Sequence, residues 1–507
     1  MKINVLDKKL FSMISAGEVV EKPASVVKEL VENSIDSGAN AITVEIKNGG
    51  RTFMRVTDNG CGMSPEDART AFLRHATSKL RTADDLAAIS TCGFRGEALA
   101  AIASVSRIDL LTKTPGAIAG TSLHLEAGNI TDESEAGCPD GTTIIIRDLF
   151  YNTPARMKFM KSDSVEGGKV AAAVQMQALA HPEVSFTFIR DGKQTLQTPG
   201  SGDLGAAVYC VYGRESAKFV EVSSRWEGYS LRGFVSKPTD ARPSRSLQTF
   251  FVNDRPVKSR LLIQALEEAY RNQIMVGKFP ACVLHLTIPP ANVDVNVHPA
   301  KTEVKFLSEK AVFDCVHYGV LGALNKTPDR PQVQLKTPPV DSAPVGNAVP
   351  GVPPAAQQQV AMPEMEALQE ELPMPKEIPW RMVGELYRSY ILVEQGDEAF
   401  LIDKHAAHER IIFEGLKANM RDKTVDSQLL MLPIEVMLMS DEVGLLDAYR
   451  DELERIGFTF TCLRNTVRVD SIPSGIQPAA VPDMFAIFAE QLYRAFTIIN
   501  NEPYHHN

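Results

Sequence analysis

Three polar side chains, Glu29, Asn33 and Asp36, recur at a spacing that places them on one face of a helix. Two carboxylates and a carboxamide could together hold a hard cation and a water molecule, because magnesium prefers oxygen ligands and keeps several waters when it bridges phosphates. Glu29, one turn before Asn33, is placed to polarise an attacking water. The alternative is that this stripe is only the solvated face of an amphipathic helix.

The helix that must carry the stripe lies in the second half of Ile14–Ala39. Pro23 suits a first-turn position, Ser25 is a candidate cap, and Gly38 stands where a helix would end. Apolar residues recur at helical spacing along the other side, at Val26, Val27, Leu30, Val31 and Ile35.

A glycine-rich turn follows this helix. Residues 42–47 and 53–58 alternate as two strands joined by an Asn-Gly-Gly turn, and the second strand ends in the sequence DNGCG. Asp58 could accept a hydrogen bond from an exocyclic amine, and Gly60 and Gly62 would let a ligand approach the backbone closely. Asp-Gly turns are common, so the motif gains weight only from its place just after the polar stripe.

Two further segments could enclose an anion. Residues 74–79 read RHATSK, and residues 91–98 read TCGFRGEA before an alanine-rich helix. Backbone amides of a glycine-flanked loop at a helix start can cradle phosphates, and glycines permit the hinge motion of a lid. The plain alternative is a loop that caps a helix. A strand over residues 142–148 then begins with Gly-Thr-Thr.

A first domain is expected over residues 1–205 and a second over 206–330, which alternates strands with a helix at 258–270. Arg255, Lys258 and Arg260 cluster at the start of that helix and could contact phosphates, although a solvated helix start would look the same. Lys301 lies on a turn just beyond His298-Pro299, where its charge could reach across a domain boundary. His298 lacks a His or Cys partner at ligand spacing, which favours a structural role.

The last part of the chain alternates between strand and helix patterns. Residues 382–404 are predicted to form strands, and a helix is predicted to begin near Ala406. Residues 440–456 are predicted to form one long amphipathic helix.

Composition narrows the class of protein. The 507 residues are too many for a single core, and 44% hydrophobic with 23% charged residues is typical of soluble globular proteins. No apolar run is long enough to span a bilayer, and the first residues lack a signal peptide's apolar core. Seven scattered cysteines without CxxC spacing indicate a reducing cytoplasm. A net charge of −10 argues against a uniformly basic nucleic-acid binder but allows a local basic groove.

The order of these motifs resembles the GHKL ATP-binding fold of gyrase B, Hsp90, sensor histidine kinases and MutL. The words ISAGEVVEKPASVVKELVENSIDSGA, FLRHATSK, GFRGEALA, DLFYNTPARMKF, FVNDRPV and DVNVHPAKTEV together are similar to the MutL family of DNA mismatch repair proteins. The resemblance is dense over residues 1–330 and fainter after 382. It implies an α/β (α+β) architecture: a Bergerat-type ATPase sandwich, a ribosomal-S5-like transducer domain, a Pro-rich flexible linker at 331–379 and a C-terminal dimerisation domain at 380–507.

The resemblance assigns roles to individual residues. Glu29 would be the general base, and Asn33, with Asp36 nearby, would hold Mg²⁺ against ATP. Asp58 would read the adenine amino group beside Gly60 and Gly62, supported by Thr143. Lys301 would reach the γ-phosphate from the second domain. The lid around the phosphates would consist of Thr77, Ser78, Lys79, Gly93, Phe94, Arg95 and Gly96.

Many members of the family carry a nuclease in the last domain, marked by a metal-binding motif. Asp403, His405 and Glu409 match its spacing, but Lys404 replaces glutamine and would repel metal ions if it pointed inward. No Cys-Pro-His or comparable metal-binding segment follows before residue 507. Either the nuclease is absent or the chain has been cut short, and we do not expect an active nuclease. The segment Gln428–Pro433 (QLLMLP) resembles a sliding-clamp-binding motif, although a buried strand would account for it equally well.

The resemblance implies a slow ATPase that acts as a matchmaker in mismatch repair, a homodimer that closes around DNA and couples MutS to a downstream helicase or nicking endonuclease. A cytoplasmic protein associated with the nucleoid is expected, with no membrane partner. The rival functions are an ATP-regulated metal-dependent nicking endonuclease and a GHKL chaperone or topoisomerase subunit. A histidine kinase is disfavoured because no phosphoacceptor helix precedes the ATP motifs.

Overall fold

The computed structural model describes residues 20–77, 96–226, 228–294, 304–326, 380–386, 390–395, 398–404, 407 and 427–501. The chain divides into two compact units. Residues 1–327 and 419–507 form the first, and residues 328–418 form the second. Each unit is described by itself.

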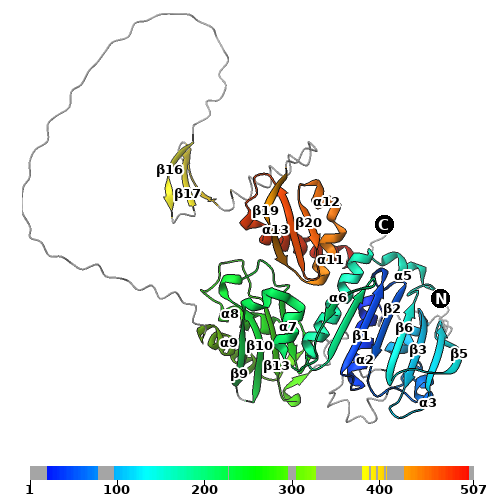
Figure 1. Ribbon diagram of the computed structural model, residues 1–507. Helices are drawn as coiled ribbons and strands as arrows, with labels where there is room; N and C mark the ends of the chain where they lie inside the picture. Colours follow the sequence, from blue (N-terminus) through cyan, green and yellow to red (C-terminus); the bar gives the residue numbers. More distant parts are fainter. Residues whose placement is uncertain are drawn as a thin grey trace, which may run out of the picture. The chain divides into compact units, whose positions relative to one another are not determined.

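The amino-terminal part of the first unit is built on an eight-stranded sheet (Figure 1). Its strand order is β5-β4-β3-β6-β2-β1-β7-β8, and β1 and β7 are its parallel pair. Inward-facing residues alternate with solvated ones along the central strands, as expected for half-buried strands. The strands are β1 (Ala41–Lys47), β2 (Phe53–Asp58), β3 (Arg107–Lys113), β4 (Gly120–Glu126), β5 (Asn129–Ala136), β6 (Gly141–Arg147), β7 (Ser185–Arg190) and β8 (Lys193–Gln197).

Two helices, α2 (Pro23–Asp36) and α6 (Asp163–Ala180), pack against each other and against this sheet (Figure 1). The predicted apolar side of α2 is buried, with Val26 and Val27 fully enclosed. Ser25 does not cap the helix: the N-cap is Lys22, and no side chain accepts there. The reason is that the helix already begins at Pro23, so Ser25 lies inside its first turn. The shorter helices are η1 (Asn48–Gly50), α3 (Pro65–Thr70), α4 (Ala98–Ser104) and α5 (Pro154–Phe159).

The next part of the first unit is a five-stranded sheet with the order β12-β11-β13-β10-β9. Helix α8 (Arg260–Ala269) begins two residues later than predicted, because Ser259 accepts from the Leu262 amide as the N-cap. Leu262, Leu266 and Tyr270 are buried in the core that α8 shares with the sheet. The other elements are α7 (Leu204–Tyr212), η3 (Gly213–Lys218), β9 (Phe219–Trp226), β10 (Tyr229–Ser236), η4 (Pro238–Asp240), β11 (Gln248–Val252), β12 (Arg255–Val257), β13 (Cys282–Thr287), η5 (Pro290–Asn292), β14 (Val293–Asp294), β15 (Lys305–Phe306) and α9 (Glu309–Lys326).

The carboxy-terminal part of the first unit is a three-stranded sheet, β19-β21-β20, with helices beside it. The single helix predicted over Ser440–Ile456 is instead two, with a bend at Tyr449. At this bend the Arg450 guanidinium donates to the Phe460 carbonyl of the neighbouring strand at 2.6 Å. That contact holds the first residue of the second helix beside the strand that contains Phe460. The elements are β19 (Ser427–Met437), α11 (Ser440–Ala448), α12 (Arg450–Arg455), β20 (Thr459–Cys462), β21 (Thr466–Pro473), η6 (Pro478–Ala480) and α13 (Val481–Asn501).

The described part of the second unit is an antiparallel meander of β16 (Arg381–Leu386), β17 (Tyr390–Gln395) and β18 (Glu398–Asp403). These strands confirm the strand prediction for residues 382–404. The predicted linker at 331–379 lies outside the described residues. The helix predicted near Ala406 also lies outside them, except for isolated positions.

Within the described part of the chain, no helix is long and apolar enough to cross a membrane. Six of the seven cysteines are described, and all six are free thiols. No group of three or more His, Cys, Asp or Glu side chains among the described residues is arranged to hold a metal ion.

Candidate functional site

Asp58, the last residue of β2, is the best-built carboxylate of the predicted site. It is 9% exposed, and one of its oxygens accepts from the Ser34 hydroxyl of α2 at 2.7 Å. The other oxygen accepts from the amides of Gly60 at 2.9 Å and Thr142 at 3.2 Å. Burial raises the pKa of Asp58 above its ordinary value, and these hydrogen bonds act in the opposite direction. Donors from three segments therefore fix this acceptor at one end of the sheet.

The glycines around Asp58 are required by close backbone contacts. Gly60 approaches Ser37, so a Cβ on Gly60 would overlap the Ser37 hydroxyl. Gly62 has φ +63°, and a Cβ there would overlap the Lys113 carbonyl oxygen. Gly141 has φ +109° and lies directly against the Asp58 carbonyl. Only glycine tolerates these positions without strain, and the turn therefore stays narrow beside the carboxylate.

The predicted stripe of Glu29, Asn33 and Asp36 lies along α2, and all three residues are partly buried. The helix also carries Ser34, whose bond to Asp58 ties the stripe to the end of β2. The Ser37 carbonyl accepts from the Cys61 amide at 3.1 Å, which adds a second tie between α2 and the DNGCG turn. The structure therefore brings two motifs together that are more than 20 residues apart in the sequence.

Thr143 lies on β6, beside the strand that ends in Asp58. Its hydroxyl donates to the Thr57 hydroxyl at 3.1 Å, and the two residues face each other across the β2–β6 pairing. Ser34 and Thr142 were missed by sequence reasoning. The signal for Ser34 was a small polar residue in the buried face of a helix, where it is only 4% exposed. The signal for Thr142 was its place next to Gly141.

The two predicted lid segments meet at their ends. Gly96, at φ +61°, lies against the Ala76 backbone, and a Cβ on it would come 2.5 Å from the Ala76 carbonyl oxygen. His75 and Glu97 are 3.4 Å apart. Thr77 is exposed beside this contact. The remaining predicted lid residues and Lys301 lie outside the described part of the chain: Ser78, Lys79, Gly93, Phe94 and Arg95.

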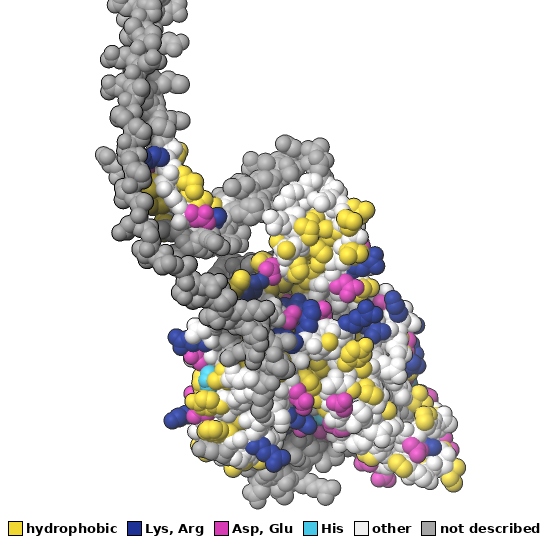
Figure 2. Space-filling model, turned by 60° about the vertical axis from the view of Figure 1, so that its left-hand side comes forward, with side chains coloured by type: hydrophobic (Ala, Val, Ile, Leu, Met, Phe, Trp, Pro, Cys, Tyr) yellow, Lys and Arg dark blue, Asp and Glu magenta, His cyan; other side chains and the backbone are white. Residues whose placement is uncertain are grey.

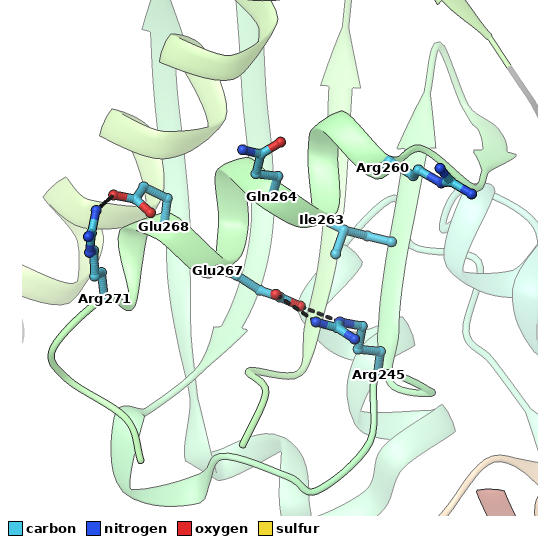
Figure 3. A pocket seen from close by; sticks show the side chains of 7 residues that line it. All are labelled: Arg245, Arg260, Ile263, Gln264, Glu267, Glu268 and Arg271. Atoms are coloured by element: carbon cyan, nitrogen blue, oxygen red, sulfur yellow. Dashed lines mark hydrogen bonds and ion pairs between the residues drawn. The ribbon is translucent and has the colours of Figure 1, made fainter. Parts of the chain in front are cut away.

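The candidate DNA contacts lie at the start of α8. Lys258 and Arg260 are exposed, and Arg255 on β12 is partly buried. A shallow hollow of about 530 Å³ runs along the outer side of α8 (Figure 3). In it Arg245 binds Glu267 through two hydrogen bonds of 2.6 and 3.0 Å, whereas Arg260 points away from the carboxylates drawn there.

The candidate second metal site is not assembled in the described residues. Asp403 ends β18, while His405 and Glu409 lie outside the described part. Lys404, the residue that departs from the nuclease motif, forms an ion pair with Glu385 of β16 at 2.8 Å. Its charge is therefore directed along the meander rather than left free beside Asp403.

The QLLMLP segment lies in β19 and is not a buried strand. Leu429, Met431 and Leu432 are 77%, 101% and 82% exposed. The pairing of β19 with β21 is interrupted between Leu429 and Ile434, and Pro433 within this gap has no amide to donate. The expectation of a buried strand was therefore wrong here, and the segment presents its apolar side chains to solvent.

Three family profiles match the chain. Residues 21–147 match the histidine kinase-, DNA gyrase B- and HSP90-like ATPase, and residues 208–325 match the DNA mismatch repair protein, C-terminal domain. Residues 383–502 match the MutL C-terminal dimerisation domain. The first of these contains α2, Asp58 and Thr143, so the assembled residues lie inside the ATPase-type domain.

Whole-chain relatives agree with these profiles. The DNA mismatch repair protein MutL of Symbiobacterium thermophilum is 38% identical, over 97% of this chain and 88% of its own. The same-named protein of Dictyoglomus thermophilum is 39% identical, over 90% of this chain and 81% of its own. A crystal structure of the N-terminal domain of a DNA repair protein superposes with a TM-score of 0.54 at 27% identity, covering 62% of this chain and 97% of that one. The chain belongs to the MutL family of DNA mismatch repair proteins.

Proposed function

We propose that this chain is a slow, ATP-dependent matchmaker of DNA mismatch repair. It would bind ATP in the first domain, change conformation as a dimer on DNA, and couple MutS to a downstream helicase or nicking endonuclease. The observation that carries the proposal is the Asp58 arrangement: a buried carboxylate held by Ser34, Gly60 and Thr142, directly beside the polar stripe of α2.

The residues present fit an adenine nucleotide. A buried acceptor whose remaining surroundings are glycine and threonine suits an exocyclic amine next to a flat ring. The close backbone contacts at Gly60 and Gly62 keep side chains out of the same space. In this proposal Asp58 orients the base, and Thr143 supports it through the Thr57–Thr143 pair. Lys301 and the lid residues 77–79 and 93–96 would close over the phosphates.

Hydrolysis would use the stripe of α2. Glu29 would take a proton from the attacking water, and Asn33, with Asp36, would supply the oxygen ligands that Mg²⁺ prefers. The metal would supply charge neutralisation between the phosphate oxygens. Glu29 is partly exposed, so a water can reach it from solvent. ATP and ADP differ by one charged group, and contacts to that group would set the conformational state.

The remaining partners follow from the other regions. The match to a dimerisation domain over residues 383–502 supports a homodimer, and joining two chains in this way would raise the effective concentration of their ATPase domains. The exposed QLLMLP segment would bind a sliding clamp. Arg255, Lys258 and Arg260 would contact DNA phosphates. The competing function, an ATP-regulated nicking endonuclease, has less support because Lys404 stands where the nuclease motif carries glutamine, and this lysine is ion-paired with Glu385.

The decisive experiment is steady-state ATP hydrolysis by the intact chain and by Glu29→Ala, with ATP binding measured in both. Loss of a general base costs about 10²- to 10⁴-fold, so we expect the variant to lose most turnover while it still binds ATP. The wild type should turn over well below the enzyme median of about 10 per second. Glu66→Ala, on the exposed first turn of α3, is the matched control. Normal hydrolysis by Glu29→Ala would return the stripe to a solvated helix face.

DNA binding has its own test. Arg260→Glu reverses an exposed charge at the start of α8, and we expect weaker binding of duplex DNA with a smaller dependence on salt, because one phosphate contact is lost. Arg271→Glu is the control, since Arg271 is already paired with Glu268 at 2.8 Å. Equal effects of the two variants would show that position 260 contributes only general charge.

A further inference from the structure

The carboxy-terminal part of the first unit contacts the amino-terminal part through a close helix crossing. Helices α6 and α11 meet at Gly168 and Gly444. A Cβ on Gly168 would lie 2.6 Å from the Ser440 carbonyl oxygen, and one on Gly444 would lie 2.7 Å from the Ser164 carbonyl oxygen. The two backbones therefore touch, and neither position accepts a larger side chain without separating the helices.

Buried polar groups make this contact specific. Gln175 on α6 donates to the Asn465 side chain at 2.8 Å and accepts from the Ser440 hydroxyl at 2.9 Å. Asn465 donates in turn to the carbonyl of Val211 on α7 at 2.9 Å. Gln175, Ser440 and Asn465 are each 4–5% exposed. Burying an amide without a hydrogen-bond partner costs free energy, and a shift of α11 along α6 would leave these side chains unpaired. The three hydrogen-bonded side chains therefore hold the two helices in this register.

Acidic side chains of the carboxy-terminal part face basic or donor groups of the amino-terminal part. Asp447 accepts from Ser164 at 2.6 Å, and Asp483 pairs with Lys278 at 2.5 Å. Lys169 and Lys258 act electrostatically on Asp441, opposing the effect of burial on its pKa. Figure 2 shows basic and acidic side chains next to one another across the middle of the molecular face that it presents.

Asp447 is a carboxylate of the docked segment that is surrounded by hydrogen-bond donors and positive charges. Burial alone would raise the pKa of Asp447, but the hydrogen bonds from Ser164 and Arg450 and the charges of Arg450 and Arg190 outweigh it and lower the pKa. The carboxylate therefore stays ionised where it meets α6. An ionised carboxylate that accepts hydrogen bonds from a Ser hydroxyl and an Arg guanidinium resembles the arrangement that a DNA phosphate would make.

We propose that the segment from Met439 to Asp483 docks in cis on α6 and the neighbouring second-domain surface, and that it competes there with DNA. The acidic side chains would occupy the place of phosphates near Lys169, Lys258 and Lys278, so the docked chain binds DNA weakly and the undocked chain binds it tightly. This inference rests on the proposed DNA-binding function of the Lys258 region. DNA itself would then favour release of the segment, because coupling between two competing ligands is reciprocal.

The same helix connects the docked segment to the candidate nucleotide site. Gln177 of α6 donates to Glu32 of α2 at 3.3 Å, and Glu32 is 6% exposed next to Asn33. The docked segment packs on one side of α6, and the polar stripe of α2 lies on the other. The three therefore belong to one packed layer. ATP hydrolysis provides a second readout of release.

The test uses the full chain without nucleotide and a fluorescent duplex oligonucleotide at fixed salt. Gly444→Leu adds bulk at the crossing while raising helix propensity, so it separates the helices without weakening α11. Ala448→Leu, one turn later and exposed, is the matched control. We expect a three- to tenfold lower Kd for Gly444→Leu and an unchanged Kd for Ala448→Leu, since apparent affinity scales with the binding-competent fraction. Equal Kd values for wild type and Gly444→Leu would overturn the competition.

A disulfide that holds the segment docked should have the opposite effect on DNA affinity. In Ser164→Cys/Asp447→Cys one sulfur takes the place of the Ser164 hydroxyl oxygen and the other the place of the Asp447 Cγ, next to the carboxylate oxygen that lies 2.6 Å from that hydroxyl. Oxidation would link two positions that are 283 residues apart, and the closed loop would make the chain migrate faster on a denaturing gel. Both single-cysteine variants control for the native thiols. We expect the oxidised chain to bind DNA at least tenfold more weakly than the same chain after reduction.

The outcomes separate the two proposals. Failure of the disulfide to form would overturn the docking itself. A disulfide that forms without changing DNA affinity would overturn the competition and leave the proposed DNA function in place. Absence of DNA binding in the wild type, in Gly444→Leu and in the reduced double variant would overturn the DNA function, and the competition with it.

Discussion

The ends of β2 and β18 each carry an aspartate that the sequence singles out, and they differ in what surrounds it. Asp58 is buried, and Ser34, Gly60 and Thr142 donate to it from three separate segments. Asp403 is partly exposed, and its neighbour Lys404 is directed to Glu385 across the meander. Both positions fit a motif by spacing. At Asp58, donors from α2 and β6 converge on one buried carboxylate.

The difference teaches what a motif needs before it can do chemistry. A carboxylate becomes a selective acceptor when burial removes competing water and fixed donors hold its orientation. Asp58 has both features. Asp403 is only partly buried, so solvent can compete for its oxygens, and the ammonium group of Lys404 is directed to Glu385.

The largest effect expected from this comparison is the loss of nucleotide binding in Asp58→Ala. We expect a loss of nucleotide affinity of about 30- to 100-fold, because a charge-assisted hydrogen bond in a buried site is worth about 2–3 kcal/mol. Asp132→Ala, an exposed aspartate on β5, should bind as the wild type does. Equilibrium binding of a fluorescent ATP analogue measures both, with thermal unfolding as the check on folding. Unchanged binding by Asp58→Ala would remove the distinction between the two aspartates.

A smaller change is expected for Ser34→Ala. The Ser34 hydroxyl lowers the pKa of Asp58 against the effect of burial, so its removal raises that pKa further. Only the ionised carboxylate accepts freely from an amine, and nucleotide affinity should therefore fall as the pH decreases, beginning at a higher pH in the variant. At neutral pH we expect a loss of about three- to tenfold, equivalent to one hydrogen bond.

The pH profile of nucleotide binding is the measurement that separates these effects. Ser104→Ala removes another buried hydroxyl, bonded to the Ala101 carbonyl at 2.8 Å, and serves as the control for a general loss of packing. Profiles of Ser34→Ala and Ser104→Ala that superpose would show that Ser34 acts on stability and not on Asp58.

Local pattern was enough to predict α2, the β1–β2 hairpin and the meander, because each depends on residue spacing within one segment. It was not enough for Ser34, whose meaning comes from Asp58, 24 residues away. It also missed the bend at Tyr449 and the contact between Gln175 and Asn465, which are 290 residues apart. Periodicity reports which face of an element is buried. It does not report which distant surface covers that face.

The smallest effect is expected for Lys404→Gln, which restores the residue that the nuclease motif carries. The Lys404–Glu385 pair is about 40% exposed on both sides, so its loss should change the free energy of unfolding by less than about 0.5 kcal/mol. Because a single glutamine does not complete a metal's ligand set, nicking of supercoiled DNA with Mn²⁺ should stay at background in the variant as in the wild type. Mn²⁺-dependent nicking that appears in Lys404→Gln and is lost again in Lys404→Gln/Asp403→Ala would contradict this. It would mean that the end of β18 is a metal site held inactive by one positive charge.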